Sequence, residues 1–495
     1  MGYDSVTFHR KQEVAERFRE IRQMTALAEL ADVLGGASSP VRGGTVARVM
    51  KALAQQVGGG IQRDLAHLLQ MSPGTVSKAI AMLRNAGLVE QEAAMARGPG
   101  HPVVPLRWTG NNVMIGITVF DRIEKWPNEA VADVMLGTLI GLDGHPPAKL
   151  KDYPPRENIS EDARNNADRL VAEIVEFVSR LASDAESCDL QVLGCGLTLI
   201  SHVDHGVIRQ SYNIEAGVHP DQWAAHDGIN LRKRLQDKLG MTVTIENDIT
   251  SLGVLENLRP SYPETDYAIV GVLFDGIGGA LVLNNNLWRG AYGLSGEPGH
   301  IPVSNVADVA LDDSPARERD HDVRIALPGA DRYPSHELPE IPVCRCGLAG
   351  HVQAFASPRS IIERAINAGI ADGEPVSIAE LASRSRRDHH KLSELFLQGG
   401  VALGRSLISA INWVNPQRII VYLPSALNED NQYLAGSYYL AGLRAEIRTN
   451  TFSRGRDTPI TFVGSSSDEI RDRLATAAAY LVLAELIDQT GRFRG

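Results

Sequence analysis

The chain of 495 residues has few of the features that mark exported or membrane proteins. Four cysteines are too few for a disulfide framework in a chain of this length. No apolar run approaches the roughly 18 residues that a membrane span requires, and residues 1–10 lack the apolar core of a secretion signal. We therefore expect a cytoplasmic protein in a reducing compartment, without a membrane partner.

The charge of the chain is unevenly distributed. The formal net charge is −11, yet residues 1–110 carry 13 Lys/Arg against 9 Asp/Glu, and the remainder carries 36 against 51. A small basic module joined to a large acidic body indicates that the module alone meets a polyanion. The alternative is ordinary scatter of surface charge.

Residues 45–87 have the apolar spacing of three short helices. Ser72 can cap the third helix and Pro73 can take its first position, which predicts a tight turn before it. Two short helices, a turn and a third helix are typical of a helix-turn-helix. The apolar positions of the three helices are Val46, Val49, Met50, Leu53, Ile61, Leu65, Leu68, Leu69, Val76, Ile80 and Leu83.

Residues 89–92 and 103–108 then predict the two strands of a β-hairpin wing, with a basic tip at 97–102. Hydroxyls and cations near the start of the third helix suit base edges and phosphates in a major groove. A helical hairpin that contacts protein is the alternative, but helix order, turn and wing together favour DNA binding. The predicted DNA contacts are Thr75, Ser77, Lys78, Arg84 and Arg97.

The rest of the chain alternates strand-like and helix-like segments, which indicates an α/β body. One carboxylate, Asp248, follows a short buried strand at 243–245, and α/β folds place ligands at such strand ends. A helix-capping role for Asp248 is the alternative. Other strands are expected over 113–119, 134–140, 190–199, 267–274 and 281–283, with helices over 159–181 and 249–258. A Gly-rich turn at 275–280 lets the backbone approach a ligand or is simply a tight hairpin.

Four side chains of the C-terminal half have the types and spacing of metal ligands. Cys344 and Cys346 form a Cys-x-Cys pair, His351 follows five residues later, and His300 ends the turn Gly296-Glu297-Pro298-Gly299-His300. Four such donors are what a closed tetrahedral zinc site needs. Taken alone, Cys-x-Cys also occurs by chance in ordinary protein cores.

Several motifs occur in one order, and through them the chain resembles the ROK family of sugar-responsive repressors and sugar kinases, in its transcriptional-regulator branch. The resemblance implies a two-lobed, actin-like (ribonuclease H-like) α/β body with a sugar in the cleft, behind an N-terminal winged helix-turn-helix. The motifs are the winged helix at 44–108, Glu246-Asn247-Asp248, Asp275-Gly276-Ile277-Gly278-Gly279, Gly296-Glu297-Pro298-Gly299-His300, Cys344-x-Cys346-Gly347-x-x-Gly350 and Asn415-Pro416.

The resemblance also implies roles for single residues. Asn247, Asp248, Glu297 and His300 fall on the family's sugar contacts, and Asp248 on its catalytic base. His300, Cys344 and Cys346 fall on its structural zinc ligands. His351 stands where the family has a third cysteine, and histidine also ligates zinc. Gln353 replaces a sugar-contacting glutamate and keeps only its hydrogen bonding.

Three departures concern the nucleotide loops of family kinases. Val119 and Phe120 replace the glycines of the first phosphate loop, where the backbone must approach closely. Asp275 stands where kinases have threonine and would repel a triphosphate. Leu423-Pro424 replaces the adenosine-binding Gly-Gly. Near the sugar, Ile200-Ser201 replaces the family's Pro-Gly. These changes predict a protein without kinase activity, in which Asp248 is a vestigial base.

The sequence thus predicts a DNA-binding transcriptional regulator, a repressor, that senses a sugar, amino sugar or sugar phosphate. Its expected partners are a double-stranded DNA operator and a second copy or more of itself, as a homodimer or homotetramer. An ATP-dependent sugar kinase with a DNA-binding domain is the alternative, and a sensor that lost its ligand is a third.

The predicted domains follow from these motifs. They are a helical arm (1–43), the winged helix-turn-helix (44–110), lobe 1 (111–246), lobe 2 with the zinc motif and an insertion at 303–343 (247–466), and a C-terminal helix (467–495).

Overall fold

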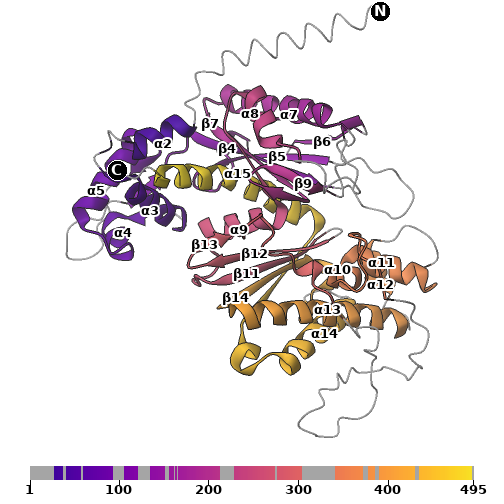
Figure 1. Cartoon of the computed structure of the whole chain (residues 1–495). Coiled ribbons are helices and arrows are strands. Elements are labelled where there is room, and N and C mark those ends of the chain that lie inside the picture. Colours follow the sequence, from indigo (N-terminus) through magenta and orange to yellow (C-terminus); the bar gives the residue numbers. More distant parts are fainter. Residues whose placement is uncertain are drawn as a thin grey trace, which may run out of the picture. The chain divides into compact units, whose positions relative to one another are not determined.

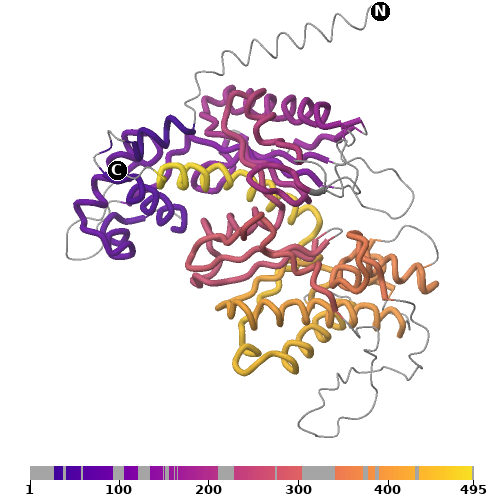
Figure 2. Tube along the Cα trace, viewed as in Figure 1, coloured from indigo at the N-terminus to yellow at the C-terminus, as the bar shows by residue number. Residues whose placement is uncertain are grey.

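The chain forms two compact units. The computed structural model describes residues 27–36, 39, 41–56, 60–92, 105–120, 134–150, 155–160, 162–163, 166–211, 228–273, 276–303, 341–371, 377–384, 390–429 and 434–492. Unit 1 comprises Met1–Phe120, Ala132–Ser261 and Arg471–Gly495, and unit 2 comprises Asp121–Val131 and Tyr262–Ile470. Residues 247–261, expected in the second lobe, therefore group with unit 1. Figures 1 and 2 trace the chain from indigo to yellow.

A winged helix-turn-helix opens unit 1. It contains α2 (Leu27–Gly35), α3 (Gly43–Ala54), α4 (Gln62–Leu68) and α5 (Pro73–Asn85), followed by the wing strands β2 (Val89–Gln91) and β3 (Pro105–Trp108) (Figure 1). The three helices and the wing predicted from the sequence are present. Most of the arm (1–26) and the wing tip (93–104) lie outside the described residues.

Two details of this domain differ from the prediction. Gly60 and Ile61 form a short strand, β1 (Gly60–Ile61), which pairs with β3, so Ile61 is not helical. Leu68, expected on the buried side of the second helix, is 57% exposed. The apolar spacing did not show that Ile61 lies in a strand or that Leu68 is exposed. Helix α4 has only seven residues and buries only Leu65 and Ala66, so its periodicity is too short to read.

The body of unit 1 is built on a five-stranded sheet in the order β10-β7-β4-β5-β6. The central strand β4 pairs antiparallel with β5 and parallel with β7, and β7 pairs parallel with β10. The helices α7 (Ala167–Ser187) and α8 (Leu231–Leu239) add apolar side chains to its core. The strands are β4 (Asn112–Phe120), β5 (Val134–Gly141), β6 (Arg156–Asn158), β7 (Gln191–Leu199) and β10 (Val243–Asn247), with a hairpin of β8 (Ser201–Asp204) and β9 (Val207–Ser211).

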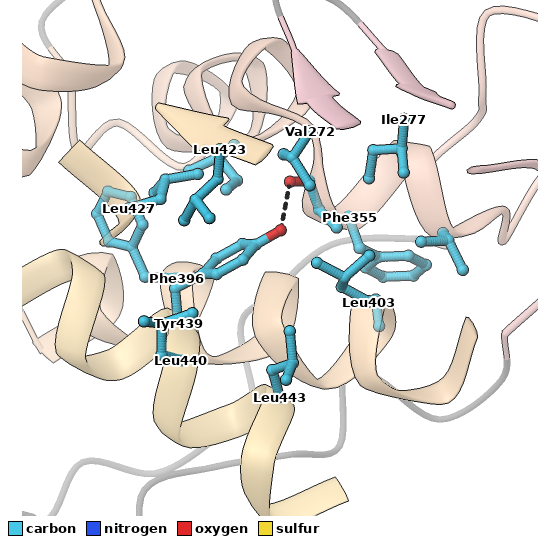
Figure 3. Packing of buried hydrophobic residues seen from close by; sticks show 14 of the residues in the cluster. Val272, Ile277, Phe355, Phe396, Leu403, Leu423, Leu427, Tyr439, Leu440 and Leu443 are labelled. Carbon is cyan, nitrogen blue, oxygen red and sulfur yellow. Dashed lines mark hydrogen bonds between the residues drawn. The ribbon is translucent and has the colours of Figure 1, made fainter. Parts of the chain in front are cut away.

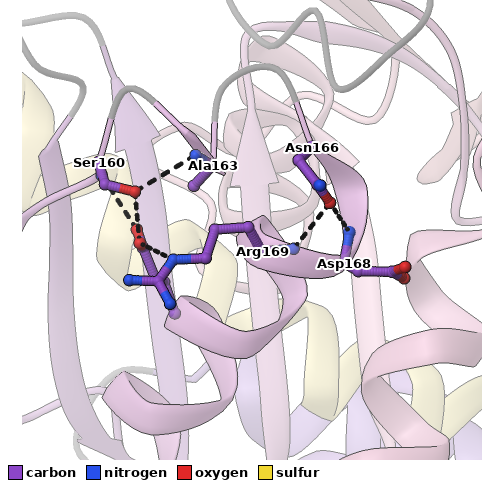
Figure 4. Close-up of polar contacts among 6 residues, drawn as sticks. Ser160, Ala163, Asn166, Asp168 and Arg169 are labelled. Atoms are coloured by element: carbon purple, nitrogen blue, oxygen red, sulfur yellow. Dashed lines mark hydrogen bonds and ion pairs between the residues drawn. The ribbon is translucent and has the colours of Figure 1, made fainter. Parts of the chain in front are cut away.

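Helix α7 begins later than the sequence indicated. Asn166 is its N-cap and accepts hydrogen bonds from the backbone N–H groups of Asp168 (2.9 Å) and Arg169 (3.1 Å) (Figure 4). Ser160, expected at the helix start, accepts the Ala163 N–H at 3.2 Å just before the helical residues 162–163, and its hydroxyl donates to Glu173 at 2.5 Å (Figure 4). A capping asparagine thus sets the helix start, as its preference for that position predicts.

Unit 2 repeats the same sheet topology, in the order β13-β12-β11-β14-β15. Here β11 is the central strand, antiparallel to β12 and parallel to β14, which in turn is parallel to β15. Two sheets of equal strand order and direction agree with the α/β architecture predicted from the sequence. The strands are β11 (Tyr267–Leu273), β12 (Gly276–Leu283), β13 (Asn286–Trp288), β14 (Arg418–Pro424) and β15 (Ile460–Ser465).

The Gly-rich motif of unit 2 is a strand and not a turn. Gly276, Gly278 and Gly279 all lie within β12 and pair with residues of β11. The backbone packs closely at Gly279, where a Cβ would lie 3.1 Å from the carbonyl oxygen of Gly296. The prediction that 275–280 is a turn was wrong for Gly276–Gly279, because a close approach of backbone and a tight turn both call for glycine. The alternative of a tight hairpin is confirmed, because β11 and β12 pair antiparallel from Leu273 and Gly276 onwards.

The core of unit 2 lies between its sheet and five helices. Figure 3 shows Tyr439 at its centre, surrounded by apolar side chains. The Tyr439 hydroxyl donates a hydrogen bond to the carbonyl oxygen of Ala356 at 3.0 Å, which satisfies the one polar group of this fully buried ring. The helices are α10 (Val352–Ala356), α11 (Pro358–Asn367), α12 (Ile378–Arg384), α13 (His390–Val414) and α14 (Leu434–Asn450).

The C-terminal helix α15 (Ser467–Arg492) lies against the sheet of unit 1 at backbone distance. A Cβ at Gly196 would lie 1.7 Å from the carbonyl oxygen of Ala478, and one at Gly116 would lie 2.0 Å from that of Ala475. At the far end of α15, a Cβ at Gly491 would lie 3.5 Å from the Cβ of Ala47 in α3. Helix α15 therefore reaches from the sheet to the winged helix-turn-helix (Figures 1 and 2).

Within the described parts of the chain, none of the helices combines the length and the apolarity that crossing a bilayer requires.

Candidate functional site

The four predicted metal ligands of unit 2 come together. The donor atoms of His300, Cys344, Cys346 and His351 all lie within 4.8 Å of one another. Cys346 Sγ is 3.2 Å from His351 Nδ1, the two Nδ1 atoms are 3.4 Å apart, and Cys344 Sγ is 3.9 Å from His300 Nδ1. Zinc bonds of 2.0–2.3 Å in a tetrahedron give ligand separations of about 3.3–3.8 Å. The arrangement can therefore hold a metal ion.

A tight turn places the two thiols. The Gly347 N–H donates to the Cys344 carbonyl oxygen at 2.8 Å, and the Cys344 N–H to the Leu348 carbonyl oxygen at 2.9 Å. Gly347 has a φ of 86° and Gly350 a φ of 79°, values that side-chain-bearing residues rarely adopt. The glycines of the Cys-x-Cys-Gly-x-x-Gly motif thus fold the chain back so that both thiols face one point.

The histidine ligands are linked through the backbone. His351 forms an isolated antiparallel bridge with Pro302, and the Val352 N–H donates to the Ile301 carbonyl oxygen at 3.0 Å. His300 ends the short 3-10 helix η4 (Pro298–His300). Two ligands that are 51 residues apart in sequence are therefore held by adjacent backbone.

The turn before His300 packs directly on the Gly-rich strand. Gly296 has a φ of 88°, and a Cβ there would lie 2.3 Å from the carbonyl oxygen of Gly279. From the other side, the Ser406 hydroxyl of α13 donates to the Pro298 carbonyl oxygen at 3.1 Å. Sequence reasoning missed Ser406, which follows Arg405 in α13 and has no pattern that marks it. These contacts fix where Glu297 and His300 stand.

Burial sets the charge state of the cluster. Burial lowers the pKa of His300, and the neighbouring His351 lowers it further. Burial also raises the pKa of the Cys344 thiol to about 11. Both groups are thus neutral in the absence of a cation, and an ion that binds displaces the thiol proton. Because Nδ1 of His300 faces the cluster, its Nε2 is left for a hydrogen bond elsewhere.

Gln353, a predicted sugar contact, forms a hydrogen bond to the backbone within unit 2. Its side chain is in α10, and Oε1 accepts the Ile277 N–H of β12 at 3.3 Å. Gln353 is only 8% exposed. Glu297 precedes η4 and is half-buried. The amide oxygen of Gln353 therefore braces β12 beside the turn that bears Glu297 and His300.

The other predicted sugar contacts lie in unit 1, at the start of α9 (Asp248–Leu258). Asn247 is the N-cap, and its Oδ1 accepts the N–H groups of Ile249 (2.9 Å) and Thr250 (3.2 Å). Its Nδ2 donates to the Ser201 carbonyl oxygen at 3.3 Å. The capping role considered for Asp248 thus belongs to Asn247. Asp248 is 7% exposed, and burial raises its pKa to about 6.

The predicted recognition helix is α5. Its N-cap is Ser72, whose Oγ accepts the Thr75 N–H at 3.1 Å, and Pro73 takes the first position as predicted. Val76, Ile80 and Leu83 are buried, while Ser77, Lys78 and Arg84 are exposed. Thr75 is half-buried, and its hydroxyl is 2.7 Å from that of Ser72. Arg97 lies outside the described residues.

The altered nucleotide loops coincide with packed strand ends. Val119 and Phe120 close β4 and are 4% and 3% exposed, and the Arg471 guanidinium lies 4.3 Å above the Phe120 ring. Leu423 is buried at the end of β14. Asp121 and Asp275 lie outside the described residues. The bulky replacements thus serve as core.

Residues 154–434 match the model of the ROK family, more than half of the chain, and the chain belongs to that family. Among curated relatives, it is 22% identical over 376 residues to the DNA-binding transcriptional dual regulator NagC of Escherichia coli (74% of this chain, 78% of NagC). It is 19% identical over 300 residues to a xylose repressor of Caldicellulosiruptor bescii (58% of this chain). The match spans 62% of that repressor, less than two thirds of its length.

Solved structures share the fold. A ROK family transcriptional regulator, described as a homologue of the Escherichia coli MLC protein, aligns with 90% of this chain and 99% of its own at a TM-score of 0.63 and 17% identity. A ROK hexokinase from Thermus thermophilus aligns with 75% of this chain and 99% of its own at a TM-score of 0.51 and 22% identity. The predicted actin-like ROK body with an N-terminal winged helix-turn-helix is confirmed.

We expect the purified protein to contain about one zinc ion per chain, because four donors of the preferred types converge on one point. Cys344→Ser should lose the metal and lower the unfolding temperature, whereas His351→Cys should keep it. Elemental analysis and thermal unfolding with and without chelator measure both. Cys188→Ser, at a cysteine outside the cluster, is the control. A fully folded, ligand-responsive wild type without metal would contradict the assignment.

We also expect Asp248 to make stability depend on pH. Its pKa is raised from 3.8 to about 6, so the folded state binds the proton more tightly than the unfolded chain. The free energy of unfolding should therefore fall as pH rises through about 4 to 6, and above that window the loss is complete, on the order of 3 kcal/mol. Asp248→Asn should remove this slope and stabilise the protein at neutral pH.

Urea unfolding across that pH range measures the effect. Asp168→Asn is the matched control, because Asp168 also lies in the first turn of a helix but its side chain is 91% exposed. An unchanged pH slope in Asp248→Asn would show that the carboxylate is not buried as described.

Proposed function

We propose that this chain is a DNA-binding transcriptional repressor whose ROK body senses a sugar, amino sugar or sugar phosphate in the cytoplasm. The observation that carries the proposal is the exposed face of α5, with Ser77, Lys78 and Arg84, on a winged helix-turn-helix joined to a ROK body. The similarity to a xylose repressor and to the DNA-binding transcriptional dual regulator NagC supports it.

The recognition helix has the chemistry that DNA binding requires. Lys78 and Arg84 can neutralise phosphates or read guanine edges, and Ser77 can donate to either. Arg107 of the wing is paired with Glu90 at 2.6 Å and with Glu92 at 3.3 Å, so the described part of the wing is not a bare cation surface. The contacts on α5 should therefore dominate, with Arg97 as a further proposed contact.

The effector contacts are proposed on both units. In unit 2 they are Glu297, Gln353 and the cluster residue His300, and in unit 1 they are Asn247 and Asp248 at the start of α9. Carboxylate, amide and imidazole groups suit neighbouring sugar hydroxyls. Structural zinc held by His300, Cys344, Cys346 and His351 would fix the His300 ring.

The packed strand ends favour a sensor over a kinase. A phosphate loop needs accessible backbone N–H groups, whereas Phe120 is 3% exposed under the Arg471 guanidinium. An ATP-dependent sugar kinase is the rival function, because ROK kinases have the same fold. We expect the repressor to act as a homodimer or homotetramer on a two-fold operator, as helix-turn-helix dimers do.

Operator binding tests the proposal. An operator can be selected from a random duplex library with the wild type and its affinity measured by fluorescence anisotropy. Lys78→Ala and Arg84→Ala should each weaken binding by about tenfold, because a direct base or phosphate contact contributes roughly 1–3 kcal/mol. Arg63→Ala, at an exposed cation of α4, is the comparison variant. Unchanged affinity in both α5 variants would sink the assignment of the recognition helix.

Effector sensing is tested on the same complex. N-acetylglucosamine, its 6-phosphate, glucose and xylose are added in turn, and one of them should release the operator from the wild type but not from Glu297→Gln. Coupled ADP release with the same sugars tests the rival function. Robust Asp248-dependent turnover would overturn the repressor proposal in favour of a kinase.

A further inference from the structure

Helix α9 is buried along almost its whole length. Ten of its eleven residues are buried, Thr250 being the exception. Burial all round is typical of a helix in the middle of a core, where close packing leaves little room for bending. At 1.5 Å per residue it spans roughly 16 Å. Such a helix moves as a rigid body, so a displacement at one end reaches the other.

The two ends of α9 lie at different functional parts of unit 1. The first residue is Asp248, with Asn247 as its cap. At the other end, the carbonyl oxygen of Asn257 accepts a hydrogen bond from Nε2 of Gln55 at 2.9 Å. Gln55 is the C-cap residue of α3, the first helix of the helix-turn-helix. The last carbonyl groups of a helix lack partners within it. Gln55, which belongs to the winged helix-turn-helix, supplies a hydrogen-bond donor to one of these carbonyl groups of α9.

A second contact keeps the end of α9 in place. Glu256 is 3% exposed and accepts a hydrogen bond from Arg473 of α15 at 3.3 Å, and its other oxygen accepts the Ser261 N–H at 3.2 Å. The C-terminal end of α15 also contacts α3, where Gly491 lies beside Ala47. Helix α3 is therefore held by the ends of two body helices, which are joined to each other through Glu256.

We propose that α9 transmits the state of the effector contact at Asp248 to the DNA-binding domain, with Gln55 as the positioning residue at its far end. The inference rests on the proposed function, since it names how the sensor controls operator binding. An effector works only through its differential affinity for two arrangements, and in this proposal those arrangements differ in the position of α9. The Gln55–Asn257 hydrogen bond is the contact through which the position of α9 affects α3.

A double-mutant cycle tests the coupling without any sugar. Asn247→Ala removes the cap of α9 at the effector end, and Gln55→Ala cuts the contact at the other. In the wild-type background, Asn247→Ala should weaken operator binding by at least about threefold, within what loss of an N-cap costs. In the Gln55→Ala background the same substitution should change affinity little. Gln55→Glu, which has the same size but no donor, should behave as Gln55→Ala does.

Two further variants separate coupling from damage. Gln55→Lys keeps an N–H donor and should preserve the effect of Asn247→Ala, and Gln91→Ala, at an exposed glutamine of the wing, should leave it unchanged. Asp248→Asn is the second perturbation if Asn247→Ala does not fold. Equal effects of the α9 substitution in both backgrounds would overturn the proposal.

Amide hydrogen exchange of α3 provides a readout independent of DNA. Asn247→Ala should speed exchange in residues 43–54 of the wild type and add nothing in Gln55→Ala. If the wild type binds no duplex, the repressor proposal fails, while the exchange cycle still decides the coupling. If the operator binds but exchange in α3 responds equally in both backgrounds, the coupling fails alone.

Discussion

The close approach of α15 to the sheet of unit 1 is the constraint on which the arrangement of that unit depends. It requires glycine at Gly116 and Gly196, because any Cβ there would overlap the carbonyl groups of Ala475 and Ala478. Small residues on both sides bring the helix close enough to reach α3. The same helix holds Glu256 through Arg473. The DNA-binding domain is therefore seated on the body by two helices and not by a flexible linker.

Unit 2 depends in a similar way on contacts between backbone segments. Gly279 and Gly296 let the turn before His300 lie on β12, Gln353 bonds the backbone of β12, and Ser406 bonds the backbone of the turn. The metal cluster then joins this turn to the segment at 344–351. A tetrahedral ion would stiffen the turn by linking segments far apart in sequence, the setting in which loop closure stabilises most.

Sequence patterns predicted what depends on local chemistry. Ser72, Pro73 and the apolar face of α5 identified the recognition helix, and motif order identified the fold. The pairing of β1 with β3 was missed, because two residues carry no periodicity. Gly276–Gly279 was assigned to a turn, since glycine spacing does not distinguish a turn from a strand against which backbone packs. Ser406 and Gln55 were beyond reach, because their partners are backbone carbonyls over 100 residues away.

The buried carboxylate of Asp248 destabilises the fold, and this cost in stability indicates a functional role. Its neighbour Asn247 already caps α9 with two hydrogen bonds, so a carboxylate is not needed to begin the helix. Burial raises the pKa of Asp248 to about 6, which means that its charge destabilises the fold at neutral pH. An uncharged side chain at this position would give a more stable helix start. Buried carboxylates with shifted pKa values concentrate at binding and catalytic sites. We therefore propose ligand recognition at the start of α9 as the role that accounts for this cost.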